Sequence, residues 1–188
     1  MASNTAPLRD AGINPEDLLE CAAEFIHAQH WDQSAQLAEL SADEVELLSR
    51  HGARVVADPA ARRRLVLRMS AEYGVICADA LSQQQAADYL GVSQSRVRQR
   101  LLEGSLFAIQ HLGERLLPRF QFEGGQSLPH LAPILRTLGA EAHPLRVFRF
   151  FGMPNADLQD ADGNPMSVRD WLISGGSLEP VLKLAEDA

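Results

Sequence analysis

A short polar run from Gln94 to Gln99 has the side chains that recognise the edges of DNA bases. Within six positions it presents five polar residues: Gln94, Ser95, Arg96, Arg98 and Gln99. In the major groove arginine pairs well with guanine, and glutamine pairs well with adenine. Val97 and Leu101 lie four residues apart, so a helix would turn both inward and leave the polar residues facing out. We therefore expect these five residues to face a DNA groove.

The sequence also supplies the elements that would hold this helix in place. Ser82 and Gln85 have the spacing of a capping box, which predicts a helix that begins at Gln83. Gly91 is expected to end that helix, because glycine enters the left-handed conformation without steric cost. Ser93 is a favourable N-cap for the second helix. Two short helices joined by a glycine turn predict a helix-turn-helix, whose second helix lies in the major groove.

A glycine-centred hairpin is expected directly after the second helix. Segments 106–110 and 115–122 are predicted as strands, and Gly113 supplies the positive φ that a tight turn needs. This wing would place Arg115 and Arg119 near phosphates, where contacts fix the register of a protein on DNA. Residues 81–122 are thus predicted to form a winged helix-turn-helix.

The arginines alone are weak evidence for this interpretation. The chain has sixteen arginines and a single lysine, Lys183, so arginine is its default cation. A helical segment with Arg96, Arg98 and Arg100 on its exposed face could also be the corner of an inert helical bundle. The joint pattern of capping box, glycine turn, apolar spacing and hairpin is harder to obtain by chance, and the prediction rests on it.

Residues 81–122 resemble the excisionase and MerR-type helix-turn-helix. The similarity rests on the run AADYLGVS, on Arg96-Val97 followed by Leu101, and on a glycine-containing hairpin that ends near Pro118-Arg119-Phe120. The resemblance implies a DNA-binding module that carries a wing.

Charge is distributed unevenly along the chain. The overall net charge is −8, but residues 81–122 hold five arginines against three acidic residues, a net charge of +2. Residues 1–57 and 157–188 are acidic, with net charges of −7 and −5. A basic patch of this size neutralises few phosphates, so we expect DNA binding by a monomer to be modest and salt-sensitive. The acidic flanks suit a second, basic partner, or they serve solubility.

Length and composition indicate a globular protein with one or two small domains. The 188 residues are 46% hydrophobic and 22% charged. No apolar run reaches the roughly 18 residues of a membrane span, and the first residues lack the apolar core of a secretory signal. Cys21 and Cys77 do not form a disulfide framework. We therefore expect a cytoplasmic protein.

The flanking regions are predicted to be helical. Helices are expected over about 15–28 and 42–56, and a third begins at Asp58-Pro59, so that residues 14–80 form a helical arm that could serve dimerisation. Gly124 to Ser127 is predicted as a linker. Beyond it we expect helices over 130–138 and 144–151, a tight turn at 160–165, a helix capped by Ser167, and a last helix capped by Ser177.

Other residue clusters do not predict catalysis or metal binding. Residues 160–164 hint at a calcium loop, but Pro165 and Trp171 stand where an EF-hand needs glycine and a carboxylate, so a β-turn is the better interpretation. His27 and His30 share a helical face, but no further ligand cluster lies nearby, and a solvated face is favoured. Nucleophile-elbow, phosphate-loop and zinc-protease motifs are missing from the sequence. We expect no enzyme, no cofactor and no metal.

The C-terminal segment resembles the toxin-binding domain of the Xre/MbcA/ParS antitoxins. The run WLISGG at 171–176, followed by Glu179-Pro180-Val181, is similar to the pattern that closes those proteins, although Leu178 replaces a proline. In that family the domain docks on a RES-type toxin that destroys NAD, and the helix-turn-helix binds the operon's own promoter. The resemblance implies a toxin-facing or dimer surface shaped by Trp171, Gly175, Gly176 and Val181.

Together these features predict a mainly α protein with one small β-hairpin wing. Its domains are expected to be a helical arm at 14–80, the winged helix-turn-helix at 81–122 and a helical partner-binding domain at 128–188. We expect a DNA-binding, antitoxin-like repressor that binds its own promoter and neutralises a protein toxin. It should act as a homodimer, because one short helix reads too few base pairs. The alternatives are an interaction adaptor with a vestigial helix-turn-helix and an excisionase-like architectural DNA-binding protein.

Overall fold

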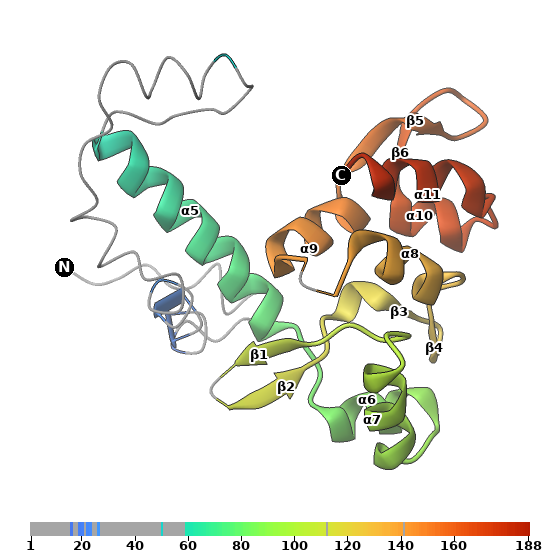
Figure 1. Cartoon of the computed structure of the whole chain (residues 1–188), viewed down its shortest axis with the longest axis horizontal. Coiled ribbons are helices and arrows are strands. Elements are labelled where there is room, and N and C mark those ends of the chain that lie inside the picture. Colours follow the sequence, from blue (N-terminus) through green and yellow to red (C-terminus); the bar gives the residue numbers. More distant parts are fainter. Residues whose placement is uncertain are drawn as a thin grey trace. The chain divides into compact units, whose positions relative to one another are not determined.

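The computed structural model describes three ranges of the chain, 59–111, 113–140 and 142–188, and a few residues before them: Glu16, Leu19, Glu20, Ala22, Ala23, Ile26 and Arg50. The described part is mainly helical with small antiparallel hairpins, as the sequence predicted (Figure 1). Most of the helices expected over 15–28 and 42–56 lie outside the described residues, as do Cys21, His27 and His30. The chain divides into two compact units, residues 1–75 and 76–188.

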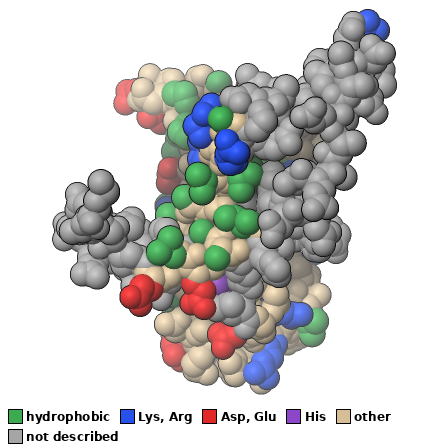
Figure 2. All heavy atoms as spheres, turned by 90° about the vertical axis from the view of Figure 1, so that its left-hand side faces the viewer, with side chains coloured by type: hydrophobic (Ala, Val, Ile, Leu, Met, Phe, Trp, Pro, Cys, Tyr) green, Lys and Arg blue, Asp and Glu red, His purple; other side chains and the backbone are tan. Residues whose placement is uncertain are grey.

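Helix α5, Pro59–Ala78, is the main described element of the first unit, and its last residues belong to the second. It begins at the proline that the sequence indicated, because a missing N–H is tolerated at the start of a helix. Leu67 is 64% exposed, and Leu65 and Val75 are also exposed. Figure 2 shows hydrophobic side chains on the face of the molecule that lies to the left in Figure 1. Among the described residues, no helix has the length and apolar character needed to cross a membrane.

The described residues of the second unit form six α-helices and three small hairpins. Its helices are α6 Gln83–Leu90, α7 Gln94–Leu102, α8 Leu131–Leu138, α9 Pro144–Gly152, α10 Val168–Ile173 and α11 Leu178–Glu186. Its strands are β1 Ile109–His111, β2 Glu114–Leu116, β3 Phe122–Glu123, β4 Gln126–Ser127, β5 Pro154–Gln159 and β6 Pro165–Ser167. The strands form three separate antiparallel pairs, β1–β2, β3–β4 and β5–β6. The single hairpin wing of the prediction is therefore one of three hairpins in this unit.

The wing hairpin is shorter than the sequence predicted. β1 and β2 pair from Ile109 opposite Leu116 to His111 opposite Glu114. Pro118 has no N–H to continue the ladder, and residues Arg119–Gln121 form a short 3₁₀ turn, η1, where a strand was expected. Between β2 and η1, Leu117 forms an isolated β-bridge with Leu81. The Leu81 N–H donates to the Leu117 carbonyl at 2.9 Å, and the Leu117 N–H donates to the Leu81 carbonyl at 2.7 Å. This bridge ties the base of the wing to the start of α6.

A buried glutamine anchors the wing to the loop before it. Gln121 has no exposed surface. Its Oε1 accepts a hydrogen bond from the Phe107 N–H at 2.8 Å, and its Nε2 donates to the carbonyl oxygens of Phe107 at 2.8 Å and Pro118 at 3.0 Å. The side chain thus satisfies three backbone groups on the two sides of β1–β2, which a buried amide must do to avoid a desolvation penalty.

Residues 124–127 are not the linker that the sequence suggested. Gly124 and Gly125 have φ values of 54° and 77° and form the turn between β3 and β4, in which Phe122 lies opposite Ser127. Tight hairpin turns and linkers are both rich in glycine, so the sequence alone could not distinguish a turn from a linker here. A single core extends across this point, and the ring of Phe120 stacks on that of Phe151 with 4.9 Å between centroids. Residues 81–122 and 128–188 therefore belong to one compact unit.

The C-terminal helices follow the predicted positions. Ser167 caps α10 by accepting a hydrogen bond from the Asp170 N–H, and the carboxylate of Asp160 accepts the N–H groups of Asp162 and Asn164 in the predicted turn. Ser177 occupies the N-cap of α11 but makes no side-chain capping bond. α8 packs against α11, and α10 packs against α9. These helices cover the side of the core away from α6 and α7 (Figure 1).

His143 makes the stability of α9 dependent on pH. It is the N-cap residue, and its Nδ1 accepts a hydrogen bond from the Leu145 N–H at 3.2 Å. Partial burial, and then the charge of Arg149, lower the pKa of His143 in the folded state. The unfolded chain therefore takes up this proton first, so the stabilisation is complete above the unfolded pKa of about 6.5 and is lost as the pH falls from there through the folded pKa.

We expect acidification to destabilise the wild-type protein more than a His143→Asn variant, which keeps a good N-cap residue without the titrating ring. Urea unfolding at about pH 7.5 and about pH 5.5 brackets the titration of a histidine and measures the two drops in unfolding free energy. Equal drops in both proteins would show that His143 contributes nothing to the pH dependence.

Candidate nucleic-acid interface

The two short helices α6 and α7 meet as the sequence predicted. Both halves of the capping box are present, with the Ser82 N–H donating to Gln85 Oε1 at 2.8 Å and the Gln85 N–H donating to Ser82 Oγ at 3.2 Å. Gly91 has the left-handed φ of 65° that ends α6. The Ser93 hydroxyl accepts the Arg96 N–H and caps α7. Buried side chains hold the pair together: Ala86, Ala87 and Val97.

The polar face of α7 is accessible. Ser95, Arg96, Arg98 and Gln99 are exposed and Gln94 is half-buried. Arg96 Nη1 lies 3.6 Å from Glu103 Oε1, and Gln99 Nε2 donates to the same oxygen at 2.8 Å. Both partners of the ion pair are about half exposed, and exposed pairs of this kind stabilise a protein by less than about 1 kcal/mol. Separating Arg96 from Glu103 therefore costs little free energy.

Arg98 is already oriented by two glutamines. Its Nε donates to Gln83 Oε1 and its Nη2 donates to Gln94 Oε1, both at 3.2 Å. The guanidinium thus lies between the first residues of α6 and α7, and the amide groups of both glutamines keep their N–H donors. Holding a long side chain in this way reduces the rotamer entropy that it would lose on binding. Gln83 joins the candidate site through this contact, which spans 15 positions of sequence and has no local signal.

Arg100 does not share this exposed face, contrary to the expectation. It is half-buried, and its Nη2 donates to Ser127 Oγ in β4 at 2.8 Å. Burial, together with the charge of Arg96, lowers the pKa of Arg100, and Glu103 opposes that shift. Arg100 lies two residues before the last residue of α7 and faces the hairpin β3–β4. The alternation of Arg96, Arg98 and Arg100 in the sequence therefore does not place all three on one exposed face.

The two arginines assigned to the wing have different positions. Arg115 lies on β2 opposite Gln110 and is exposed, as a wing contact requires. Arg119 lies beyond the wing, in η1, where its Nε is 3.5 Å from Asp79 Oδ1 and its guanidinium is 5.7 Å from the centroid of the Tyr89 ring. Arg115 is therefore the stronger candidate for a phosphate contact.

A groove runs from the end of α7 to α8 beside the wing. Most of its lining residues are apolar, and two are arginines, Arg115 and Arg136. Leu102, at the last position of α7, lines it and is 82% exposed. Within the described ranges no cluster of histidine, cysteine and carboxylate side chains could hold a metal ion.

The C-terminal residues singled out by their sequence pattern form a packed corner. The indole Nε1 of Trp171 donates to the Ser177 carbonyl at 2.9 Å, and the Gly176 N–H donates to the Trp171 carbonyl at 2.9 Å. Gly175 is exposed with φ 87°. Val181 has no exposed surface, so it shapes this corner from within the core and offers nothing to a partner.

We expect Gly176→Ala to lower the free energy of unfolding by about 1 kcal/mol or more, as overpacking does. A Cβ at this position would lie 2.3 Å from Cε2 of Trp171, whose ring must then move. Gly152→Ala is the matched control: nothing lies within 4 Å of its added Cβ, and the helical position should be neutral or stabilised by up to about 1 kcal/mol. Urea unfolding measures both changes. In a Trp171→Ala background the Gly176→Ala penalty should vanish, and an unchanged penalty there would contradict the packing account.

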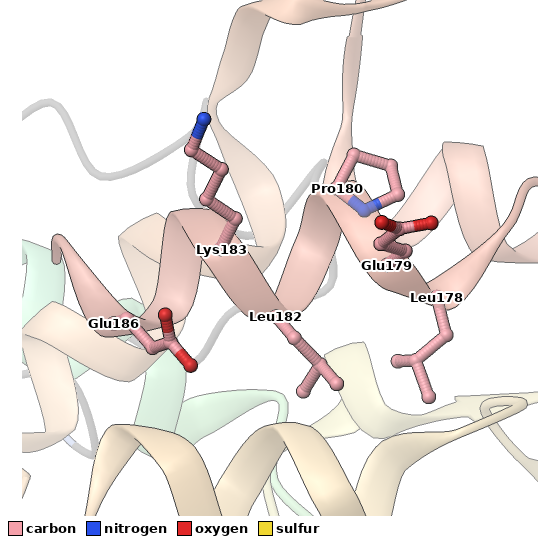
Figure 3. Close-up of a pocket in the computed structure, with 6 residues that line it drawn as sticks. All are labelled: Leu178, Glu179, Pro180, Leu182, Lys183 and Glu186. Atoms are coloured by element: carbon pink, nitrogen blue, oxygen red, sulfur yellow. The ribbon is translucent and has the colours of Figure 1, made fainter.

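Residues of α11 line a shallow depression next to this corner. Leu178 and Leu182 point toward α8, whereas Pro180 and Lys183 point away from it (Figure 3). Glu179 and Glu186 also line the depression. The surface mixes apolar, acidic and basic groups, and by itself it does not favour one kind of ligand.

No protein-family model matches this chain, and no curated protein matches it significantly. Among solved structures, the chain is similar to the NMR structure of Rv2175c, with 25% sequence identity and a TM-score of 0.45. The matched region covers 57% of this chain and 79% of that one. The similarity is too distant to carry a function over to this chain.

Proposed function

We propose that this protein binds double-stranded DNA in a sequence-dependent manner, with α7 in the major groove and the β1–β2 wing at the phosphate backbone. One observation supports the proposal above all: Arg98 is held by Gln83 and Gln94 at the exposed start of the second helix of a capped, glycine-turned pair. Recognition helices contact bases with their N-terminal residues. Arginine next to glutamine supplies donors and acceptors that distinguish guanine and adenine.

The charge of the site predicts the strength of binding. Arg96, Arg98 and Arg115 are exposed on α7 and the wing, whereas Arg100 is half-buried and donates to Ser127. Arg119 is exposed but lies in η1, outside the wing, beside Asp79. Few phosphates are then neutralised by one copy, so affinity should be modest and should fall as salt increases. A homodimer would double the contacts and read two half-sites, which is why we propose the dimer as the binding form.

A gel-shift series on the DNA upstream of the gene, repeated at several salt concentrations, tests the proposal. We expect one region to bind more tightly than unrelated DNA of the same length, with an affinity that decreases with salt. Wild-type binding with neither sequence preference nor salt dependence would refute it.

The repressor and antitoxin roles are a separate part of the proposal. They are supported by the resemblance of residues 143–188 to antitoxins of RES-type toxins, and by the exposed surface around Trp171, Gly175 and α11. Co-expression with the product of the neighbouring reading frame, followed by a growth assay, tests them. A stable complex that relieves toxicity and binds the promoter is expected. A stable complex without promoter binding would favour the adaptor alternative, and DNA bending without any partner would favour the architectural one.

A further inference from the structure

The hairpin β3–β4 contacts three helices of the second unit. On its β4 side, Ser127 Oγ accepts the hydrogen bond from Arg100 of α7. On its β3 side, the ring of Phe122 lies 5.7 Å from that of Tyr89 of α6, centroid to centroid. Also on β3, Glu123 forms an ion pair with Arg169 of α10, and Arg169 Nη2 lies 3.5 Å from the Phe122 carbonyl oxygen. Figure 1 shows the hairpin between the α6–α7 pair and the C-terminal helices.

The hairpin is short and its strands are paired directly, so its contacts are mechanically linked. Phe122 lies opposite Ser127, and Glu123 lies opposite Gln126. The two arginines reach it from opposite elements, Arg100 from α7 and Arg169 from α10. The four paired residues of the hairpin therefore provide a short polar route from α10 to α7, in addition to the shared core. Arg100 is half-buried, and its hydrogen bond to Ser127 adds a polar contact between α7 and the hairpin to the packing of α7 through Val97.

We propose that Arg100 is a positioning residue, which sets the orientation of α7 for DNA reading through Ser127, and that Glu123 and Arg169 couple this orientation to the C-terminal helices. The proposal rests on the proposed function and deepens it. Arg100 then belongs to the DNA-reading mechanism without touching DNA, and the C-terminal helices act on DNA affinity through the β3–β4 hairpin.

Ser127→Ala tests the first contact, because it removes the partner of Arg100 and leaves every basic side chain in place. We expect its discrimination between the preferred duplex and unrelated DNA to fall about three- to tenfold, the range for one hydrogen bond, while the salt dependence stays that of the wild type. Arg100→Gln should behave in the same way, and the double variant should be no worse than either single one. Ser174→Ala, which removes a hydroxyl bonded to the Trp171 carbonyl, is the matched control with wild-type DNA binding.

Two results would overturn the positioning role. A phosphate contact by Arg100 predicts that Arg100→Gln lowers the salt slope by about one, while Ser127→Ala changes nothing. Independent, additive effects of the two substitutions would likewise show that the two groups do not act together.

Glu123→Gln tests the second contact. Lower discrimination between the preferred duplex and unrelated DNA, at an unchanged salt slope, supports the coupling to α10. Wild-type discrimination refutes it.

The outcome is separable from that of the proposed function. If the wild-type protein binds no DNA, the double-mutant cycle on Arg100 and Ser127 is measured by urea unfolding and by amide hydrogen exchange in α7. Non-additive effects of the two substitutions on stability, with faster exchange confined to α7, would support the role of Arg100 in positioning α7 and refute its role in DNA binding. Additive effects of the two substitutions would refute both roles.

Discussion

Arg98→Ala is expected to weaken binding to the preferred duplex by about 1–3 kcal/mol per half-site and to relax the preference at one base position. The substitution removes a guanidinium that Gln83 and Gln94 hold at the start of α7. Because the contact is expected to be made with a base and not with a phosphate, affinity for unrelated DNA should fall much less. Fluorescence anisotropy with a selected duplex and with single-base variants of it measures the change.

Arg98→Lys separates charge from geometry. Lysine keeps the positive charge but lacks the planar fork that makes two hydrogen bonds to guanine. We expect this variant to recover affinity for unrelated DNA without recovering the base preference. Arg146→Ala is a matched control, since Arg146 lies on α9 and donates to the Ala188 carbonyl. A uniform loss on all duplexes, with a salt slope lower by about one, would identify Arg98 as a phosphate contact and contradict base reading.

Gln121→Ala is expected to lower the free energy of unfolding by about 3 kcal/mol or more, because buried groups left without partners cost about 1–3 kcal/mol each. The substitution leaves the N–H and carbonyl of Phe107 and the carbonyl of Pro118 without the hydrogen bonds that Gln121 makes to them. Gln121 is fully buried, so no bulk water replaces the lost bonds. Urea unfolding measures the loss, and faster hydrogen exchange of the amides in β1 and β2 would locate it in the wing.

Gln121→Met distinguishes the hydrogen bonds from packing. Methionine fills a similar volume with a flexible apolar chain, so a packing role alone would make this variant nearly neutral. We expect it to lose most of the stability that Gln121→Ala loses. Gln126→Ala, at an exposed position of β4, should stay within about 0.5 kcal/mol of the wild type. A Gln121→Met protein as stable as the wild type would show that the wing does not depend on these hydrogen bonds.

The elements that position the site could be predicted because their signals are local. Ser82 with Gln85, Gly91 and Ser93 each act within four residues, and the structure confirms all of them. The outward face of α7 followed from the spacing of Val97 and Leu101 in the same way, except at Arg100. Caps, turns and helical periodicity depend on nearest neighbours along the chain, which a sequence displays directly.

The features that sequence reasoning missed depend on distant contacts. The bond from Arg100 to Ser127 spans 27 positions and that from Arg98 to Gln83 spans 15. Gln121 reads as an ordinary polar strand residue until the fold buries it against Phe107. Gly124-Gly125 suits a linker and a hairpin turn equally well, and only the shared core around Phe120 and Phe151 decides between them. Val181 was assigned to a surface from a resemblance, and packing placed it in the core.

The central claim is that α7 and the wing form the DNA-binding surface. Amide chemical-shift mapping during titration with a duplex selected from random DNA tests it most directly. We predict that the largest changes fall on residues 94–99 and on β2 around Arg115, and that α11 is little affected. Changes centred on α10 and α11 with α7 unperturbed, or a selection that enriches no sequence, would contradict the claim.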